Sequence, residues 1–462
     1  MNTELWSHSQ VCRMEEVKHL YPHQLLGISC MDTTDSLGLF YDPGTGKTIM
    51  ALTWIRNALR DGRIKDALIV APASLIANWE KDIEEATDFD HITEDDVKLL
   101  KDRVAIRSYQ KLYRTSVDKV TGRRRIALRE DVDKRWGAMI VDESQALGGH
   151  SSVQTKVCLT MANLADYRFI LTGTPVSGSA KTGGEDLAKI YGQFKFLRPN
   201  IWKNWTEWCR RYVLAYDKFY KPIRYDVDAL HKVMNEMAIS VRLQDCIDLP
   251  GEIRTNVPCP LSEQKVYTDI RKGATEKYGF EIKTAGGQYT KLLQLCSGSL
   301  KKDSGATDTY STNKDDVLKE LLTDNPEPLV IFCMYRASID RCERIAKAVG
   351  RNPVVFDGRS KGPTWKEFTD GKRDVIISQY AAGGAGLNLQ RGAFMILFEP
   401  CFSTRHLTQA LARIQRTGQT KVCRYMFLYT PGTVEHKVLE SVQKGQDVVA
   451  ETFRRWAEEG SI

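Results

Sequence analysis

Several patterns that would define a class of protein are missing from this chain of 462 residues. Its 11 cysteines, an odd number, include no Cys-x-x-Cys pair, so neither a zinc-site spacing nor a disulfide framework is present in the sequence. This cysteine usage is typical of a reducing cytoplasm. No apolar run reaches the ~18 residues of a membrane-spanning helix, and the first residues, MNTELWSHSQ, lack the layout of a signal peptide.

The composition that remains is that of a globular protein. Hydrophobic residues make up 42% of the chain and charged residues 27%, and the length is sufficient for two or three domains with full cores. The formal net charge of +7 is a mild basic excess. Such an excess is compatible with binding to nucleic acid but does not establish it.

The most informative motif is YDPGTGKT at 41–48, between an apolar run and a helix-like run. Gly44 and Gly46 let backbone N–H groups close on a polyphosphate, and the following helix N-terminus adds partial positive charge. We expect Lys47 to reach the β- and γ-phosphates and the Thr48 hydroxyl to ligate Mg²⁺. Thr45 completes this predicted nucleotide loop. The alternative is a glycine-rich turn with a chance lysine.

A second motif, GAMIVDESQ at 137–145, is an apolar run that ends in two carboxylates. We expect Asp142 to hold the Mg²⁺ shell and Glu143 to orient and deprotonate the attacking water. Phosphoryl transfer needs mainly positioning and neutralisation of charge, so these groups suffice on the nucleotide side. An ordinary strand ending in a solvated Asp-Glu pair is the alternative, which the upstream GTGKT disfavours.

The order of apolar and helical runs indicates two α/β halves. Because apolar strands alternate with helices, each half is predicted to be a doubly wound parallel sheet. The predicted strands are 67–72, 104–109, 138–143 and 168–173 in the first half, and 328–335, 354–358, 374–379, 394–399 and 424–429 in the second.

The stretch between the two halves breaks this rhythm. Trp202, Trp205, Trp208 and Tyr212 follow one another at intervals of three and four, with cations between them. Aromatic side chains among cations can stack bases, but the helical spacing favours a helical insertion that buries its aromatic face. We therefore divide the chain into lobe 1 (1–184), a helical insertion and linker (185–298) and lobe 2 (299–462).

The run QALARIQRTGQ at 409–419 is predicted to place Gln409, Arg413 and Arg416 on one helical face. Two arginines far in sequence from the P-loop suit arginine fingers that reach the γ-phosphate. A solvated basic helix face is the alternative.

The run VDKVTGRRRIALRE at 117–130 has a Thr-Gly turn followed by Arg123, Arg124 and Arg125. It predicts a hairpin, and the arginines are candidates for an auxiliary contact to DNA phosphates. A solvated loop is the alternative for this charge run.

Taken in order, these motifs resemble those of the superfamily-two helicase and translocase ATPases, specifically the Swi/Snf-type branch. The resemblance runs from about Leu20 to about Val434 and includes YPHQLLGI, YDPGTGKT, DESQ in place of DEAH, LTGTP at 171–175 and GGAGLNL at 383–389. ARIQRTGQ is similar to RAHRIGQ and is the most branch-specific match. The chain departs from the pattern at Gln145, where histidine is usual, at Ala381 for arginine, and at Phe402 for tryptophan.

The resemblance implies two RecA-like lobes in tandem that use ATP and Mg²⁺. It implies that Gln24 lies on the adenine side, that Gln145 links DESQ to LTGTP, and that Gly386 and Gln409 contact the nucleotide. For Tyr109 and Tyr335, packing at a strand end is the alternative to contact with nucleic acid. The implied nucleic-acid contacts are Pro72, Ala73, Ser74, Ser108, Tyr109, Met334, Tyr335, Gly383 and Gly384.

The function implied is a DNA-dependent ATPase motor that translocates on duplex DNA and remodels branched or protein-bound DNA without reading its sequence. Alternatives are a strand-separating DNA or RNA helicase, the ATPase component of a restriction-type system, and, more distantly, a non-enzymatic binding module. The short insertions resemble those of compact phage-encoded, stand-alone members. We accordingly expect a monomeric motor in the cytoplasm of a bacterium or a phage-infected cell, without membrane contact; the sequence names no protein partner.

Overall fold

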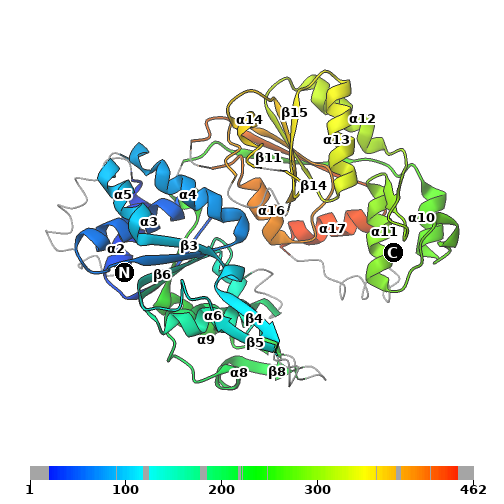
Figure 1. The fold of residues 1–462 in the computed structure, drawn as a ribbon. Coiled ribbons are helices and arrows are strands. Elements are labelled where there is room, and N and C mark those ends of the chain that lie inside the picture. The colour runs from blue at the N-terminus through cyan, green and yellow to red at the C-terminus, as the bar shows by residue number, and fades with distance from the viewer. Residues whose placement is uncertain are drawn as a thin grey trace. The chain divides into compact units, whose positions relative to one another are not determined.

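The structure of the protein is a computed structural model. It describes residues 20–89, 91–117, 124–176, 185–216, 220, 222–246, 248–360, 362–380, 387–416 and 418–445. The chain divides into two units, Met1–Asp248 and Leu249–Ile462 (Figure 1). Among the described residues, no helix has both the length and the apolar character needed to cross a membrane.

The first unit is built on a six-stranded sheet in which all neighbouring strands run parallel. The central strands are continuous apolar runs and are buried throughout, as expected for a parallel sheet covered on both faces. In spatial order the strands are β10 (Ala238–Val241), β1 (Ser36–Tyr41), β7 (Ala165–Leu171), β6 (Trp136–Asp142), β2 (Ala67–Ala71) and β3 (Val104–Ser108).

Eight α-helices of the described chain pack in this unit. α8 buries Trp208 completely, and its neighbour Trp202 is 1% exposed, so the aromatic run fills a core as its helical spacing predicts. The helices are α2 (Pro22–Asp32), α3 (Lys47–Arg60), α4 (Ile76–Glu84), α5 (Glu94–Arg103), α6 (Val153–Ala162), α7 (Lys189–Leu197), α8 (Trp205–Tyr212) and α9 (Val227–Met237).

Two antiparallel hairpins extend the first unit. β4 (Tyr113–Val117) pairs with β5 (Arg124–Leu128), which confirms the hairpin predicted at 117–130. Its turn, including Arg123, lies outside the described residues, as does the side chain of Arg124. The other hairpin joins β8 (Val213–Tyr216) to β9 (Pro222–Tyr225).

The second unit has its own six-stranded parallel sheet. Side chains of its central strand alternate between two cores: Val330 and Phe332 face one, and Ile331 faces the other. Both faces of the sheet are therefore covered. In spatial order the strands are β11 (Glu252–Pro258), β18 (Cys423–Tyr429), β17 (Phe394–Leu397), β14 (Leu329–Cys333), β16 (Val375–Gln379) and β15 (Pro353–Phe356).

The remaining elements of the second unit are mostly helical. A short hairpin, β12 (Ser299–Lys301) with β13 (Thr307–Thr309), lies beside α11. The helices are α10 (Gln264–Arg271), α11 (Ala285–Cys296), α12 (Asn313–Asp324), α13 (Arg336–Ala348), α14 (Lys366–Thr369), α16 (Thr404–Leu411) and α17 (Val434–Gln443).

The predicted fold class, two parallel-sheet α/β lobes in tandem, is confirmed. The structure places a single division after Asp248, whereas the sequence was divided at 184 and 298. In the described chain, α7 and α9 contact β1, and β10 joins the first sheet, while β11 joins the second. The predicted insertion is thus mainly helical but is shared between the two units; its separate functional identity stays a prediction.

Candidate nucleotide and nucleic-acid sites

The P-loop lies between the buried strand β1 and the first turn of α3, as predicted. Gly44 and Gly46 have φ angles of 88° and 84°, which favour glycine over residues with a side chain. A Cβ at Gly46 would also lie 2.2 Å from the Gln24 amide nitrogen. Both glycines are therefore required by backbone geometry, independently of any ligand.

Two side chains from α2 brace the P-loop. The Gln24 amide nitrogen donates to the Thr45 carbonyl at 2.9 Å, and His23 Nε2 is 3.0 Å from the same oxygen. Thr45 is fully buried, and its hydroxyl donates to the Asp42 carbonyl at 2.8 Å. Gln24 is thus a support of the loop in this structure, and its adenine-side role stays a prediction.

Lys47 is the first residue of α3, and its ammonium donates to the carbonyls of Tyr41 and Asp42 at 2.5 and 2.9 Å. The cation therefore lies over the loop that precedes it. Thr48 follows on the first turn of α3 and is half-buried. These positions agree with the strand–loop–helix geometry that a P-loop lysine and hydroxyl need.

Asp142 and Glu143 lie at the carboxyl end of β6, next to β2 and β7. Asp142 Oδ2 accepts the indole N–H of Trp79 at 3.0 Å, and Oδ1 accepts the backbone N–H of Glu143 at 2.8 Å. Glu143 has a left-handed backbone with φ 51°, which is unusual for a residue with a side chain. Such local strain is often retained at functional positions.

Burial raises the pKa of Asp142 to about 6, and the adjacent charge of Glu143 acts in the same direction. The Trp79 N–H and the Lys47 ammonium oppose this rise. The positive charge of Lys47 therefore stabilises the ionised form of Asp142, so these two predicted nucleotide-site residues interact electrostatically.

Gln145 joins DESQ to LTGTP. Its Oε1 accepts the Thr172 hydroxyl at 2.6 Å, and its amide nitrogen donates to Glu143 Oε2. LTGTP also lies against the P-loop, because a Cβ at Gly173 would be 2.7 Å from Pro43 Cδ. The contact that the resemblance implies for Gln145 is present, although glutamine replaces the usual histidine.

Trp79 and Tyr109 support the carboxylate pair, and the sequence did not assign these roles. The Tyr109 hydroxyl donates to the Asp142 carbonyl at 2.7 Å, and its side chain is 2% exposed. This burial favours the packing alternative for Tyr109, and its contact with nucleic acid stays a prediction. Trp79 lies on α4, and no spacing rule connects it to Asp142.

A groove of about 510 Å³ runs along the ends of β2 and β3. Two of the predicted nucleic-acid contacts, Ala73 and Ser108, line it together with Lys111 and Arg129. Ala73 and its neighbour Ser74 are exposed, whereas Ser108 is 6% exposed. The groove brings residues from the ends of two strands together beside cations, but its lining also includes the carboxylates of Glu80 and Asp131, and Arg129 lies 3.5 Å from Asp131. Pro72 is half-buried at the start of the same loop.

In the second unit, Met334 and Tyr335 follow β14 directly and are half-buried. Both pack in part against the core, so the packing alternative for Tyr335 remains open. The other predicted contacts of this unit, Gly383 and Gly384, lie outside the described residues, as does Gly386.

The prediction that Gln409, Arg413 and Arg416 lie on one helical face is wrong, because α16 ends at Leu411. Beyond it the backbone tightens, because Arg413 N–H donates to the Ala410 carbonyl, three residues back. Gln409 stays on the helix and is 6% exposed.

The two arginines nevertheless converge. Arg413 and Arg416 each donate Nη1 to the Leu387 carbonyl, at 3.4 and 3.3 Å. Arg413 is 7% exposed, so a fully solvated basic face is excluded for it. Gln419, which the sequence did not single out, shapes this loop: its amide nitrogen donates toward the Gln390 carbonyl at 3.1 Å and the Ile414 carbonyl at 3.0 Å.

For Mg²⁺, the described chain has no group of three or more His, Cys, Asp or Glu side chains that could hold a metal ion. Mg²⁺ at nucleotide sites is commonly held by one or two protein oxygens together with substrate phosphates and water. The hydroxyl of Thr48 and the carboxylate of Asp142 are donors of the kind that it prefers, so this pair fits the ion.

A glycine loop, a carboxylate pair and a third motif in contact on the carboxyl edge of one parallel sheet define a P-loop nucleotide site. The SNF2-related domain matches residues 25–303, and the helicase conserved C-terminal domain matches residues 313–418. The chain therefore belongs to the SNF2-related family, which confirms the Swi/Snf-type resemblance.

Individual relatives are distant and longer. An uncharacterized ATP-dependent helicase of Mycoplasma pneumoniae is 25% identical over 89% of this chain and 39% of its own length. The DNA repair and recombination protein RDH54 of Saccharomyces cerevisiae is 24% identical over 86% of this chain and 47% of its own. The SWI/SNF chromatin-remodeling complex subunit snf22 of Schizosaccharomyces pombe is 25% identical over 95% of this chain and 27% of its own. The chain thus spans less than half of these relatives.

A solved structure, the Sulfolobus solfataricus SWI2/SNF2 ATPase core in complex with dsDNA, is similar to 96% of this chain and 94% of its own, with a TM-score of 0.41 and 21% identity.

Proposed function

We propose that this protein is a DNA-dependent ATPase motor that translocates on double-stranded DNA and remodels branched or protein-bound DNA. The observation that carries the proposal is the contact chain of the first unit, in which Gln145 joins Glu143 of DESQ to Thr172 of LTGTP. Membership of the SNF2-related family supports the same reading. The names of the relatives, a helicase, a DNA repair protein and a chromatin remodeller, agree with a motor on DNA.

On the nucleotide side, the P-loop N–H groups bind the phosphates of ATP, and Lys47 exchanges its carbonyl partners for phosphate oxygens. Thr48 and Asp142 would hold Mg²⁺, which supplies neutralising charge when bound. Glu143 takes the proton of the attacking water, and Gln145 holds its carboxylate in place. Arg413 and Arg416 are proposed to neutralise the charge that develops on the γ-phosphate.

Replacement of Glu143 by glutamine is expected to leave ATP bound while lowering kcat by about 10²-fold or more, because only activation of the water is lost. Binding of a fluorescent ATP analogue and steady-state phosphate release measure the two effects separately. Thr160→Ala, on the exposed face of α6, is the matched control. A Glu143→Gln protein that turns over at the wild-type rate would remove the role given to this residue.

On the nucleic-acid side, each unit is proposed to hold backbone phosphates, which carry no sequence information. In the first unit the groove of Ala73 and Ser108 offers backbone and hydroxyl groups, with Lys111 and Arg129 as cations. In the second unit Met334 and Tyr335 occupy the corresponding place after a central strand. We also propose, from the resemblance alone, a monomeric, compact phage-like motor in a bacterial or phage-infected cytoplasm.

We expect ATP turnover to be stimulated by duplex and forked DNA of unrelated sequences, and much less by RNA. Steady-state hydrolysis with duplex DNA, forked DNA, single-stranded DNA, RNA and no nucleic acid tests this, and displacement of a triplex-forming strand reports movement along the duplex. Stimulation by RNA alone, or processive unwinding of a long blunt duplex, would favour the strand-separating helicase instead. Stimulation that requires an added nuclease subunit would favour a restriction-type component.

A further inference from the structure

One buried glutamate connects three strand ends at the carboxyl edge of the second sheet. Glu399 follows β17 closely and is 2% exposed. Its Oε2 accepts the backbone N–H of Met334 at 2.9 Å, and its carbonyl oxygen accepts the Tyr380 hydroxyl at 2.9 Å. Gln379, the last residue of β16, donates its amide N–H to the Met334 carbonyl at 3.1 Å. Met334 is thus held at both its N–H and its C=O.

These contacts join segments that have different proposed partners. Met334 and Tyr335 are the proposed DNA contacts of this unit. Glu399, by contrast, lies four residues before Ser403, the N-cap of α16. After α16 comes the loop that carries Arg413 and Arg416, here called the arginine loop. Between them Cys401 is 1% exposed and contacts the Ser403 carbonyl through Sγ at 3.5 Å. A short, packed segment of this kind transmits a displacement because it has little room to absorb one.

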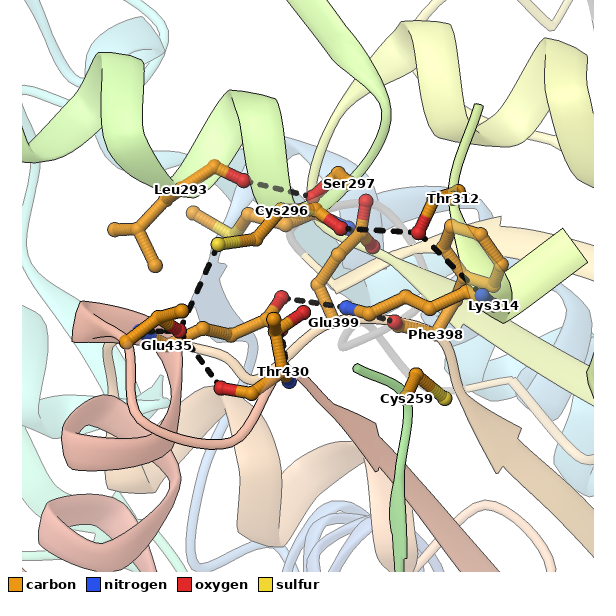
Figure 2. A network of polar contacts seen from close by, with 12 residues as sticks. Cys259, Leu293, Cys296, Ser297, Thr312, Lys314, Phe398, Glu399, Thr430 and Glu435 are labelled. Atoms are coloured by element: carbon orange, nitrogen blue, oxygen red, sulfur yellow. Dashed lines mark hydrogen bonds and ion pairs between the residues drawn. The ribbon is translucent and has the colours of Figure 1, made fainter. Parts of the chain in front are cut away.

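The Glu399 carboxylate accepts the Met334 N–H, and the Lys314 charge and the Ser338 side chain lie close to it. Figure 2 shows that the nearby Lys314 ammonium is engaged elsewhere: it bonds to Glu435 at 2.5 Å and to the Phe398 carbonyl at 3.0 Å. Glu399 Oε1 and the Tyr335 hydroxyl are buried and have no hydrogen-bond partner in the described structure. A buried carboxylate with an unsatisfied oxygen opposes folding, so stability alone does not account for this residue.

We propose that Glu399 is a positioning residue that couples DNA contact at Met334–Tyr335 to the loop of Arg413 and Arg416. A phosphate bound at Met334–Tyr335 shifts the Met334 peptide, and the hydrogen bond to Glu399 passes that shift to α16. This inference rests on the proposed function. It predicts that Glu399 governs the stimulation of ATP turnover by DNA, and not turnover in the absence of DNA.

The test compares ATP turnover with and without saturating duplex DNA for a graded set of variants. Glu399→Leu removes the acceptor, and we expect the stimulation ratio to fall about tenfold, the factor that one charge-assisted hydrogen bond commonly contributes. Glu399→Gln keeps a neutral acceptor and should give an intermediate ratio. Gln379→Leu releases the Met334 carbonyl instead and should lower the ratio in the same direction. DNA-independent kcat and the KM for ATP should stay within about twofold in all three, since none of these side chains contacts the nucleotide.

Gln288→Leu is the matched control, because it also removes glutamine-to-carbonyl hydrogen bonds, to Ile270 and Arg271, from a half-buried site of this unit. Its stimulation ratio should equal that of the wild type. Wild-type stimulation in folded Glu399→Leu would overturn the inference. Should Glu399→Leu fail to fold by circular dichroism, unchanged stimulation in Gln379→Leu would overturn it equally. Absence of DNA stimulation in the wild-type protein would instead overturn the proposed function.

Discussion

Replacement of Arg416 by alanine is expected to lower kcat for ATP hydrolysis by about 10³–10⁵-fold, with a much smaller change in the KM for ATP. Arginine fingers act on charge that develops in the transition state, so their loss slows the chemical step more than it weakens ground-state binding. Arg413→Ala should behave in the same way. Steady-state hydrolysis with saturating duplex DNA measures both parameters.

The structure supports giving Arg413 and Arg416 the same proposed role in ATP hydrolysis. Both guanidinium groups donate to one carbonyl, that of Leu387, although they lie in a turn and not on a helix. A planar guanidinium presents five N–H donors in a fork that matches phosphate oxygens. Arg416→Lys keeps the charge but not the fork, and should recover only part of the lost rate.

Arg344→Ala is the control for these variants, because this arginine is exposed on α13 in the same unit. Its kcat should remain within about twofold of the wild type, as is usual for exposed positions that touch no site. A loss of only a few-fold in both Arg413→Ala and Arg416→Ala would favour a structural role of the arginine loop over catalysis.

The sequence predicted the central strands and the edge strands β3 and β15, but it missed the edge strands β10 and β11, for a physical reason. β14 and β2 are buried along their whole length and therefore read as continuous apolar runs. β11 is almost wholly exposed, and β10 is only half-buried with an exposed serine, so neither has a hydrophobic pattern that marks a strand. Their pairing is decided by the neighbouring strand, which no local pattern reveals.

The strand–loop–helix setting of the P-loop and the contact of Gln145 with LTGTP were predictable from the sequence, whereas the contacts that support Asp142 were not. The glycines at 44 and 46 indicate a backbone with positive φ angles, and both residues have such angles in the structure. The hydrogen bonds from Trp79 to Asp142 and from Tyr109 to its carbonyl join residues 63 and 33 positions apart, and depend on how the strands are ordered. The end of α16 was missed because Ala412–Ile414 are ordinary helix formers, while Gln419 contacts distant carbonyls that close the loop.

The second large effect concerns the fold of the second unit. Lys314→Met is expected to lower its free energy of unfolding by about 3–5 kcal/mol, the usual cost of removing one partner of a buried ion pair. Lys314 is fully buried, and its partner Glu435 is 1% exposed (Figure 2). Native-state hydrogen exchange, read by mass spectrometry on peptides from β14, β17 and α17, measures the change locally. Lys319→Met breaks an exposed pair with Asp316 on the same helix and should cost less than about 1 kcal/mol.

The pH dependence of the stability that Lys314→Met loses gives a further check, because its direction can be predicted. Burial raises the pKa of Glu399 to about 7, and the Lys314 charge is the first of the influences that hold it down. A carboxyl group whose pKa is raised on folding supports the folded state below its unfolded pKa, and that support is lost as pH rises through the folded pKa. Without Lys314 the pKa of Glu399 rises further, so the stability of Lys314→Met should fall more steeply than that of the wild type above about pH 5.

The double variant Lys314→Met/Glu435→Leu distinguishes a need for the ion pair from a need for a filled core. Replacing both partners of a buried pair by apolar side chains of similar volume is often neutral, because the cost of desolvating two charges disappears with them. We therefore expect the double variant to recover most of the stability lost in Lys314→Met. Recovery is not expected to be complete, because the Thr430 N–H loses its acceptor, Glu435 Oε2, and the Phe398 carbonyl loses the ammonium. A double variant no more stable than Lys314→Met would indicate that these backbone contacts, and not the ion pair, hold α12 to α17.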